Sequence, residues 1–236
     1  MAERVDTAIN RIPMIENPLP LLRLFQLISP SLPTGAFSYS QGLEWAREIS
    51  WIQNGDDVAT WLNSILYTSF AEMELPLLIR LYQASGSEDE KAFVHWQQTT
   101  LACRETNELR GEEKVRGRAL VKLLGELGVK SKLLPHCANS QLAGFALASS
   151  FWNISREECC YGYLWSWLEN MIMAAIKIVP LGQTDGQKLL QQIFIKFPEI
   201  ISLADKIKDD EIAGSCPAVV FASCKHEQQY TRLFRS

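Results

Sequence analysis

Apolar residues recur three and four positions apart along most of this chain, a spacing that places them on one face of a helix. No alternating apolar and polar run of useful length predicts a strand. The pattern therefore predicts an all-α fold, a single-domain bundle of roughly eight to ten helices around a central buried helix. The clearest repeat is carried by Val58, Trp61, Leu62, Ile65, Leu66 and Phe70.

Prolines, glycines and capping residues divide this pattern into elements. Pro18 is expected to open the first helix, and Pro76 to break or restart the helix that begins at Val58. The long apolar run that ends at Val179 is the expected central helix. The expected helices cover residues 19–28, 40–49, 58–70, 77–82, 88–102, 104–127, 142–151, 161–179, 184–197 and 200–207.

The two ends of the chain differ from the helical part. Residues 1–17 are mixed and weakly periodic, which indicates a flexible N-terminal arm, and residues 18–225 make up the expected helical domain. Residues 226–236 follow the last expected helix and interleave Tyr, Leu and Phe with two arginines, which are residue types common in interface hot spots. A disordered terminus is the default interpretation, and a C-terminal partner-binding tail is the competing one.

The segment PLGQTDGQ, which starts at Pro180, separates two expected buried helices. Proline has no amide to donate and biases the residue before it away from helical geometry. Thr184 with Gln187 is expected to form a capping box for the next helix, and Ser155 with Glu158 another before the long apolar run.

Composition excludes several classes of protein. Apolar residues make up 47% of the 236 positions, too many for a disordered chain. A formal charge of −4 gives no electrostatic reason to expect nucleic acid or an anionic membrane as a partner. Glu169, Asn170 and Lys177 interrupt the longest apolar run, so it is interpreted as a buried helix rather than a membrane span. Scattered cysteines and no apolar leader indicate reduced thiols in the cytoplasm.

The sequence gives little support for a catalytic site or a metal-binding site. The sequence contains no P-loop and no Gly-x-Ser-x-Gly elbow. His136 with Cys137, and Cys216 with Cys224 and His226, carry soft metal ligands, but neither group has a standard spacing. We therefore expect no stably bound metal or other cofactor.

Four carboxylates lie in otherwise apolar contexts, namely Glu44, Glu72, Glu74 and Glu169. A carboxylate in such a place can be a perturbed proton-transfer group. Paired or helix-edge glutamates are more common, and we favour that interpretation.

The segment RETNELR, which starts at Arg104, has charges at helical spacing. Arg104 with Glu108, and Glu112 with Arg116, are placed to pair along one helix edge. We interpret this edge as a solvated face with weak ion pairs. The alternative is an exposed arginine that reaches a partner's nucleotide, as a GTPase-activating arginine does.

Four separated stretches resemble the urease accessory protein UreF family, in the family's order. They are LPTGAFSYSQGLE at residues 32–44, RET and ELR within 104–110, PLGQTDGQ at 180–187 and YTRLFRS at 230–236. Ala36 stands where many relatives carry a second glycine, a small departure that leaves the assignment intact.

The resemblance implies a non-catalytic maturation factor that helps deliver nickel to urease. Proteins similar to this one dimerise, bind UreD (called UreH in some organisms) and through that complex recruit the GTPase UreG to apo-urease. Nickel is then the delivered metal rather than a resident cofactor. A regulatory effect on the UreG GTPase has also been proposed within the family.

The candidate partner-binding residues are inferred from their positions in or beside the matched segments. Residues 34–44 are expected to face UreG or the second copy of a homodimer, Lys177 to serve UreG recruitment, and the tail to bind UreD. Removing residues 230–236 is expected to abolish UreD binding with little change in melting temperature. The candidates are Thr34, Gly35, Phe37, Ser38, Tyr39, Gln41, Glu44, Arg104, Glu105, Arg110, Lys177, Gln183, Asp185, Tyr230, Arg232, Leu233, Phe234 and Arg235.

Two other classes stay open: an all-α ligand-binding regulator and a small helical transferase-like enzyme. The scarcity of histidine argues against the enzyme. The acidic balance argues against a regulator that reads DNA.

Overall fold

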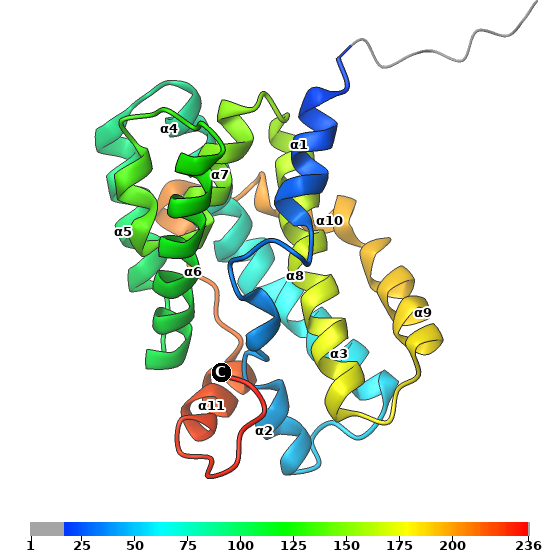
Figure 1. Ribbon diagram of the computed structural model, residues 1–236. Coiled ribbons are helices and arrows are strands. Elements are labelled where there is room, and N and C mark those ends of the chain that lie inside the picture. Colours follow the sequence, from blue (N-terminus) through cyan, green and yellow to red (C-terminus); the bar gives the residue numbers. More distant parts are fainter. Residues whose placement is uncertain (1–16, 236) are drawn as a thin grey trace, which may run out of the picture.

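The computed structural model describes residues 17–235, and every regular element within that range is a helix. The helices are joined by short connections and pack into one bundle (Figure 1). The predicted all-α class is confirmed. The α-helices of the described residues are α1 Leu19–Ile28, α2 Leu43–Glu48, α3 Gly55–Ile65, α4 Leu75–Gly86, α5 Glu90–Ala102, α6 Asn107–Glu126, α7 Gln141–Phe151, α8 Arg156–Ile178, α9 Gln183–Phe194, α10 Phe197–Ala204 and α11 Pro217–His226.

Helix α8 is the central helix of the bundle, and α1, α9, α4 and α7 are among its neighbours. The predicted capping box at its start is confirmed: Ser155 Oγ accepts from the Glu158 amide at 3.2 Å, and the Glu158 carboxylate accepts from the Ser155 amide at 2.9 Å. The helix ends because Pro180 favours extended geometry at Val179, which has φ −106° and ψ 148°.

Helix α7 lies in the core, and residues 141–149 are all buried. Glycines let α6 pack closely against α7 and against the segment before it. A Cβ on Gly144 would lie 2.8 Å from Leu120 Cδ2, and one on Gly117 would lie 2.8 Å from the Ser140 amide nitrogen. This packing fixes the inward side of α6, from which several charged residues of the site project.

Of the two outcomes predicted at Pro76, the break is wrong and the restart of a helix is confirmed. The chain passes from α3 through a π-helical segment, Leu66–Glu74, directly into α4, so it stays helical from 55 to 86. Pro76 lies in the first turn of α4. The wider π turn ahead of it relieves the clash that a proline ring makes inside a regular helix.

The predicted start of a helix at residue 104 is also wrong. α6 begins at Asn107, because Thr106 caps it by accepting from the Leu109 amide at 3.1 Å. Arg104 therefore lies in the connection before the helix, where its side chain can turn into the core.

The predicted capping box at Thr184 and Gln187 does not form. α9 begins at Gln183, with a glycine as its cap residue and no side-chain cap bond. Packing positions this helix instead, since a Cβ on Gly186 would lie 2.5 Å from Ile176 Cδ1 of α8.

Helix α11 was not predicted from the sequence. Its residues are mostly apolar or small without a clear three-and-four repeat, so periodicity carried no signal. Tertiary packing places it: Gly42 has φ +84° and lies so close to α11 that a Cβ there would be 2.8 Å from Ala222 Cβ. After α11 the chain turns back and ends beside α2 (Figure 1).

The expected N-terminal arm lies outside the described residues, apart from Asn17. Within residues 17–235, none of the helices combines the length and apolar character that crossing a bilayer requires. All six cysteines fall in this range and are unbridged.

Candidate functional site

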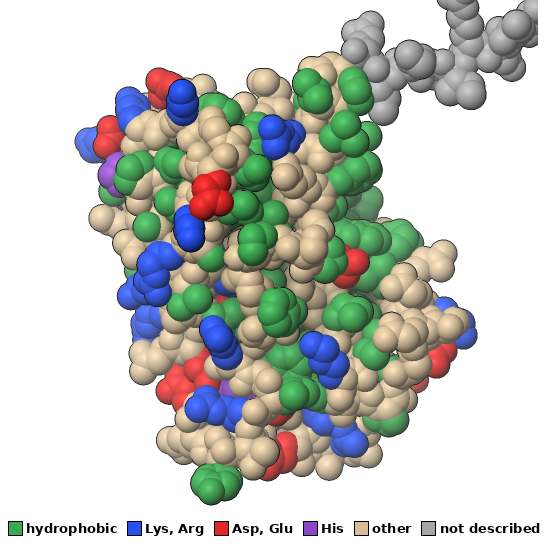
Figure 2. Space-filling model, viewed as in Figure 1, with side chains coloured by type: hydrophobic (Ala, Val, Ile, Leu, Met, Phe, Trp, Pro, Cys, Tyr) green, Lys and Arg blue, Asp and Glu red, His purple; other side chains and the backbone are tan. Residues whose placement is uncertain are grey.

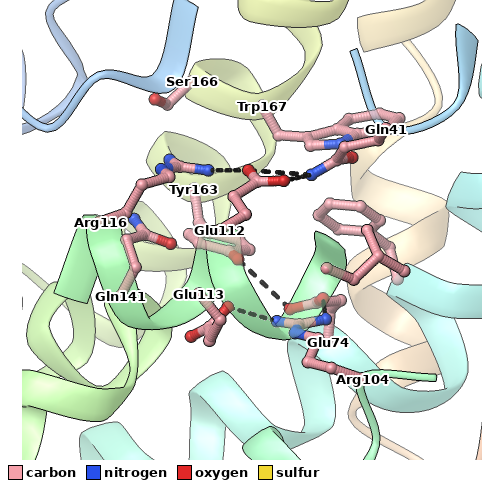
Figure 3. Close-up of a pocket in the computed structure, with 12 residues that line it drawn as sticks. Gln41, Glu74, Arg104, Glu112, Glu113, Arg116, Gln141, Tyr163, Ser166 and Trp167 are labelled. Atoms are coloured by element: carbon pink, nitrogen blue, oxygen red, sulfur yellow. Dashed lines mark hydrogen bonds and ion pairs between the residues drawn. The ribbon is translucent and has the colours of Figure 1, made fainter. Parts of the chain in front are cut away.

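An inner charge cluster around Arg104 joins the end of the π-helical segment to α6 and α8 (Figure 3). The guanidinium pairs with Glu74 through Nη1 and with Glu113 Oε2 through Nη2, the latter at 2.8 Å. Tyr163 donates its hydroxyl to the Glu74 carboxylate at 3.2 Å. The side chains of Arg104, Glu74 and Glu113 are 12%, 8% and 7% exposed, so this is a buried pair of carboxylates neutralised largely by one cation.

Glu113 is held in its charged form by this surrounding. Its Oε1 accepts from Ser140 Oγ at 2.7 Å and from the Leu142 amide at 3.0 Å. Burial opposes ionisation, but Arg104 and these donors outweigh it and hold the pKa of Glu113 below its ordinary value. Burial also lowers the pKa of Arg104, and the two carboxylates more than compensate, leaving it well above its ordinary value.

A second buried pair lies beside the first, between α6 and the loop before α2. Glu112 Oε1 lies 2.7 Å from Arg116 Nη1 and accepts from Gln41 Nε2 at 3.2 Å. Trp167 of α8 donates its indole N–H to Gln41 Oε1 at 2.9 Å. In Figure 3, Glu112 lies between Arg116 and Gln41, and the indole of Trp167 covers the amide. The predicted Glu112–Arg116 pair is confirmed, but it is buried rather than solvated.

A third group, which we call the tail clamp, consists of Glu44, Glu108 and His226 together with residues 232–235. His226 is fully buried; its Nδ1 lies 3.0 Å from Glu108 and its Nε2 3.2 Å from Glu44. Each ring nitrogen of His226 therefore faces a glutamate carboxylate. The predicted pair of Arg104 with Glu108 is therefore wrong, because each has other partners.

The clamp holds the C-terminal tail on the bundle. The Glu44 carboxylate accepts from the amides of Leu233 at 2.7 Å and Phe234 at 2.9 Å. Arg232 Nη1 lies 2.9 Å from Glu108 Oε1. Phe234 is 5% exposed, so the default interpretation of a disordered terminus is wrong for this part of the chain.

The tail also contacts two other candidate segments. The Arg235 amide donates to the Ser38 carbonyl at 2.7 Å, and Lys177 Nζ lies 5.5 Å from the centre of the Phe234 ring. The loop 34–44, the end of α8 and the tail are far apart in sequence, yet they form one continuous surface.

The side chains on this surface differ in exposure. Phe37, Leu233 and Tyr230 are 63%, 64% and 103% exposed, whereas Thr34 and Tyr39 are buried. Gly35 adopts φ +75° in a tight turn with open space around it.

Other predicted residues lie away from this surface or inside the bundle. Glu105 is exposed and Arg110 half-buried, whereas Arg104 is bound on both sides by carboxylates, so the expectation of an exposed arginine is wrong for Arg104. Gln183 and Asp185 are exposed at the start of α9, where Asp185 pairs with Lys188 at 3.1 Å.

Sequence reasoning missed the roles of Glu108, Glu113 and His226. Carboxylates in apolar contexts were a usable signal, and the preferred interpretation that Glu44 and Glu74 are paired is confirmed. Their partners come from segments distant in sequence, which spacing cannot reveal.

The chemistry of these groups is that of structural ion pairs. The cavity at the two inner pairs has a volume of about 50 Å³, which holds a few water molecules and no substrate. Among the described residues, no group of three or more His, Cys, Asp or Glu side chains is arranged to hold a metal ion. His136 pairs with Glu90 at 3.0 Å.

Comparisons with known proteins identify the family of this chain. A model of the UreF family matches residues 52–194. The urease accessory protein UreF of Alcanivorax borkumensis is 51% identical over 222 residues, which cover 91% of this chain and 97% of that protein. Those of Alkalilimnicola ehrlichii and Pseudomonas putida strain F1 are 46% and 43% identical, over 91% and 92% of this chain and 95% and 98% of theirs. This chain belongs to the UreF family of urease accessory proteins.

Proposed function

We propose that this chain is a non-catalytic cytoplasmic adaptor that assembles with UreD and UreG on apo-urease and supports nickel insertion. Nickel is the cargo of that assembly, and no resident cofactor is needed. The observation that supports the proposal is the surface formed by the loop 34–44, Lys177 and the tail. It joins two of the family-like segments, the loop and the tail, with Lys177 at the end of α8, and displays exposed aromatic and aliphatic side chains.

The side chains beneath this surface support an adaptor rather than an enzyme. Their charged groups form ion pairs with other side chains of this chain and accept hydrogen bonds from its backbone amides. Such bonds hold the loop and the tail in one geometry, which lowers the entropic cost of binding a partner.

The direct test measures assembly with purified UreD, UreG and apo-urease. We expect Lys177→Glu to weaken UreG recruitment to the UreD complex and to lower urease activation. Lys206→Glu, an exposed lysine outside this surface, is the matched control. Equal recruitment by parent and Lys177→Glu would remove this surface from the proposal, and failure of the parent chain to bind any of the three proteins would remove the proposal itself.

We also propose that two copies pair through an apolar face on α1. Leu19, Leu22 and Phe25 are 64%, 55% and 56% exposed on this helix. Beside it lies an apolar groove of about 470 Å³, whose lining includes Trp165 and Ile195. Exposed apolar area of this kind favours self-association.

Sedimentation velocity tests the pairing. Leu22→Glu with Phe25→Glu is expected to give a monomer, because each charge would be buried against an apolar surface. A dimer of unchanged stability in this variant would exclude the α1 face.

A further inference from the structure

The outward side of α6 has features that the fold of this chain does not explain. Glu113, Gly117, Leu120 and Leu124 point inward and are buried. The opposite side carries Gly111, Val115, Arg118 and Lys122, at the spacing of one helix face, and Val115 is 38% exposed.

Cations dominate this outward side. Arg110, Lys114, Arg118 and Lys122 follow one another at steps of four residues, and none of them forms an ion pair with a described residue. Like charges at this spacing destabilise a helix. The carboxylates in the first half of α6 are used elsewhere: Glu112 and Glu113 face the core, and Glu108 belongs to the tail clamp.

Figure 2 shows lysine and arginine side chains gathered at the left edge of this view, where Figure 1 places α6. Glu126 is an exposed carboxylate at the C-terminal end of the helix. The chain as a whole carries a formal charge of −4, so this basic surface is local.

Two glycines on α6 add an independent observation. A Cβ on Gly111 or Gly125 would meet no atom within 4 Å, whereas one on Gly117 would lie 2.8 Å from a backbone nitrogen. Glycine inside a helix is less stable than alanine. Gly117 has a packing reason within the chain, and Gly111 and Gly125 have none there. A glycine on an exposed face permits close approach of another backbone.

We propose that this side of α6 binds an acidic segment of a partner protein. The α6 basic face, as we call it, consists of Gly111, Lys114, Val115, Arg118 and Lys122. The segment lies along the helix, pairs with its cations and approaches its backbone at Gly111. This rests on the proposed function, since the partner is then a component of the urease maturation assembly.

The charges favour this occupant over two others. A second copy of the chain would place cations against cations across a two-fold axis, which is repulsive. Nucleic acid is disfavoured because the acidic remainder of the chain would repel a long polyanion.

The first experiment removes charge without changing the helix. Arg118→Gln with Lys122→Gln is compared with Lys91→Gln with Lys206→Gln, a control that removes the same charge from exposed positions elsewhere. Binding to purified UreD, UreG and apo-urease is measured at low and high salt. We expect the α6 variant to associate on the order of tenfold more slowly with one of them at low salt, and the difference to shrink at high salt. Equal association by both variants and the parent would overturn the proposal.

The second experiment separates binding from stability. Gly111→Ala adds a methyl group in open space, so the chain alone should melt a few degrees higher, roughly 2 to 4 °C. The same methyl group should weaken binding of the acidic partner, by about tenfold, if the backbones approach there. A variant that is stabilised and binds like the parent would exclude close approach at Gly111.

A third experiment does not depend on the urease proteins. Poly-L-glutamate should bind the parent and the control variant alike, and the Arg118→Gln with Lys122→Gln variant more weakly. Equal binding by all three chains, or tighter binding of duplex DNA than of poly-L-glutamate, would contradict the proposal. Poly-L-glutamate is not a component of urease maturation, so this test of the α6 basic face stands even if the proposed function is wrong.

Discussion

The inner charge cluster and the tail clamp contain similar chemical groups but have different structural roles. In both, a basic side chain lies between a largely buried carboxylate of α6 and a second glutamate: Arg104 between Glu113 and Glu74, and His226 between Glu108 and Glu44. The inner cluster joins elements of the core, whereas the clamp joins the bundle to a terminal segment. Helix α6 therefore holds the fold together at one position and a separable surface at another.

The two α6 carboxylates also differ in how they are stabilised. Glu113 accepts from Arg104, a backbone amide and a hydroxyl, and its pKa lies below the ordinary value despite burial. Burial raises the pKa of Glu108, and His226 and Arg232 offset that only in part. A permanent cation with two neutral donors therefore holds charge at Glu113 more firmly than an imidazole and a half-exposed arginine hold it at Glu108.

The largest effect should come from breaking the inner cluster. Arg104→Met leaves Glu74 and Glu113 buried without their shared cation, and we expect a loss of about 3 to 5 kcal/mol in the free energy of unfolding. Urea unfolding measures it, with Arg118→Met on the exposed side of α6 as the control, expected within about 0.5 kcal/mol of the parent. A loss below about 1 kcal/mol for Arg104→Met would mean that the cluster does not hold the fold.

Removing the tail should cost less and should leave the core intact. Truncation of residues 230–236 exposes the surface that Phe234 covers and removes the amides that Glu44 binds, so we expect a loss of about 1.5 to 3 kcal/mol. This differs from the expectation, based on sequence alone, of an unchanged melting temperature. Thermal unfolding followed by circular dichroism measures the loss, and a melting temperature equal to the parent's would mean that the tail is not docked in solution. Loss of UreD binding remains the expected functional effect.

The pKa shifts predict opposite pH dependences for the two carboxylates. The lowered pKa of Glu113 makes a stabilising contribution that is present above its ordinary value and is lost as pH falls through the lowered pKa. The raised pKa of Glu108 makes a stabilising contribution of the opposite kind. That contribution is fully present below the ordinary pKa of a glutamate and is lost as pH rises through the raised pKa. The two groups thus oppose each other on acidification.

Melting temperature followed from neutral to acidic pH tests this opposition. Relative to the parent, Glu113→Gln should lose less stability on acidification, because the variant lacks the carboxylate whose lowered pKa makes folding less favourable at acidic pH. Glu108→Gln should lose more stability on acidification, because the variant lacks the carboxylate whose raised pKa makes folding more favourable at acidic pH. Parallel curves for the two variants would contradict the assigned shifts.

The smallest effect concerns the outer edge of the clamp. The Arg232 side chain is 40% exposed where it pairs with Glu108, so Arg232→Gln should cost less than about 1 kcal/mol. Chemical denaturation measures it, and the cost should shrink further at high salt. A loss as large as that of the whole tail would show that Arg232, rather than Phe234 and the backbone amides, fixes the tail.

Sequence predicted the helical class and most helices, because amphipathic repeats and caps are local. The capping box at Ser155 and the end of α8 at Pro180 depend on neighbouring residues, and both were predictable. At Pro76 the restart of a helix was predicted correctly, whereas the π-helical segment that keeps the chain helical ahead of it was not.

The site was harder to predict because its contacts are long-range. Arg104 pairs with Glu74, thirty positions earlier, and His226 joins Glu44 and Glu108 from the opposite end of the chain. α11 has no helical repeat, so the helix that carries His226 was itself missed. The charge spacing within residues 104–116 therefore predicted an exposed edge of ion pairs. In the folded chain several of these residues form buried clusters with partners that are distant in sequence.

Amide hydrogen exchange compares the two clusters most directly. The Leu142 amide is bound by Glu113 in the core, and the Leu233 and Phe234 amides are bound by Glu44 in the clamp. We predict that Leu142 exchanges only through global unfolding, that Leu233 and Phe234 are protected but exchange faster through local opening, and that His226→Leu accelerates the tail amides alone. Tail amides that exchange like an unfolded chain in the parent, or a variant that accelerates Leu142 equally, would contradict the separation of fold and surface.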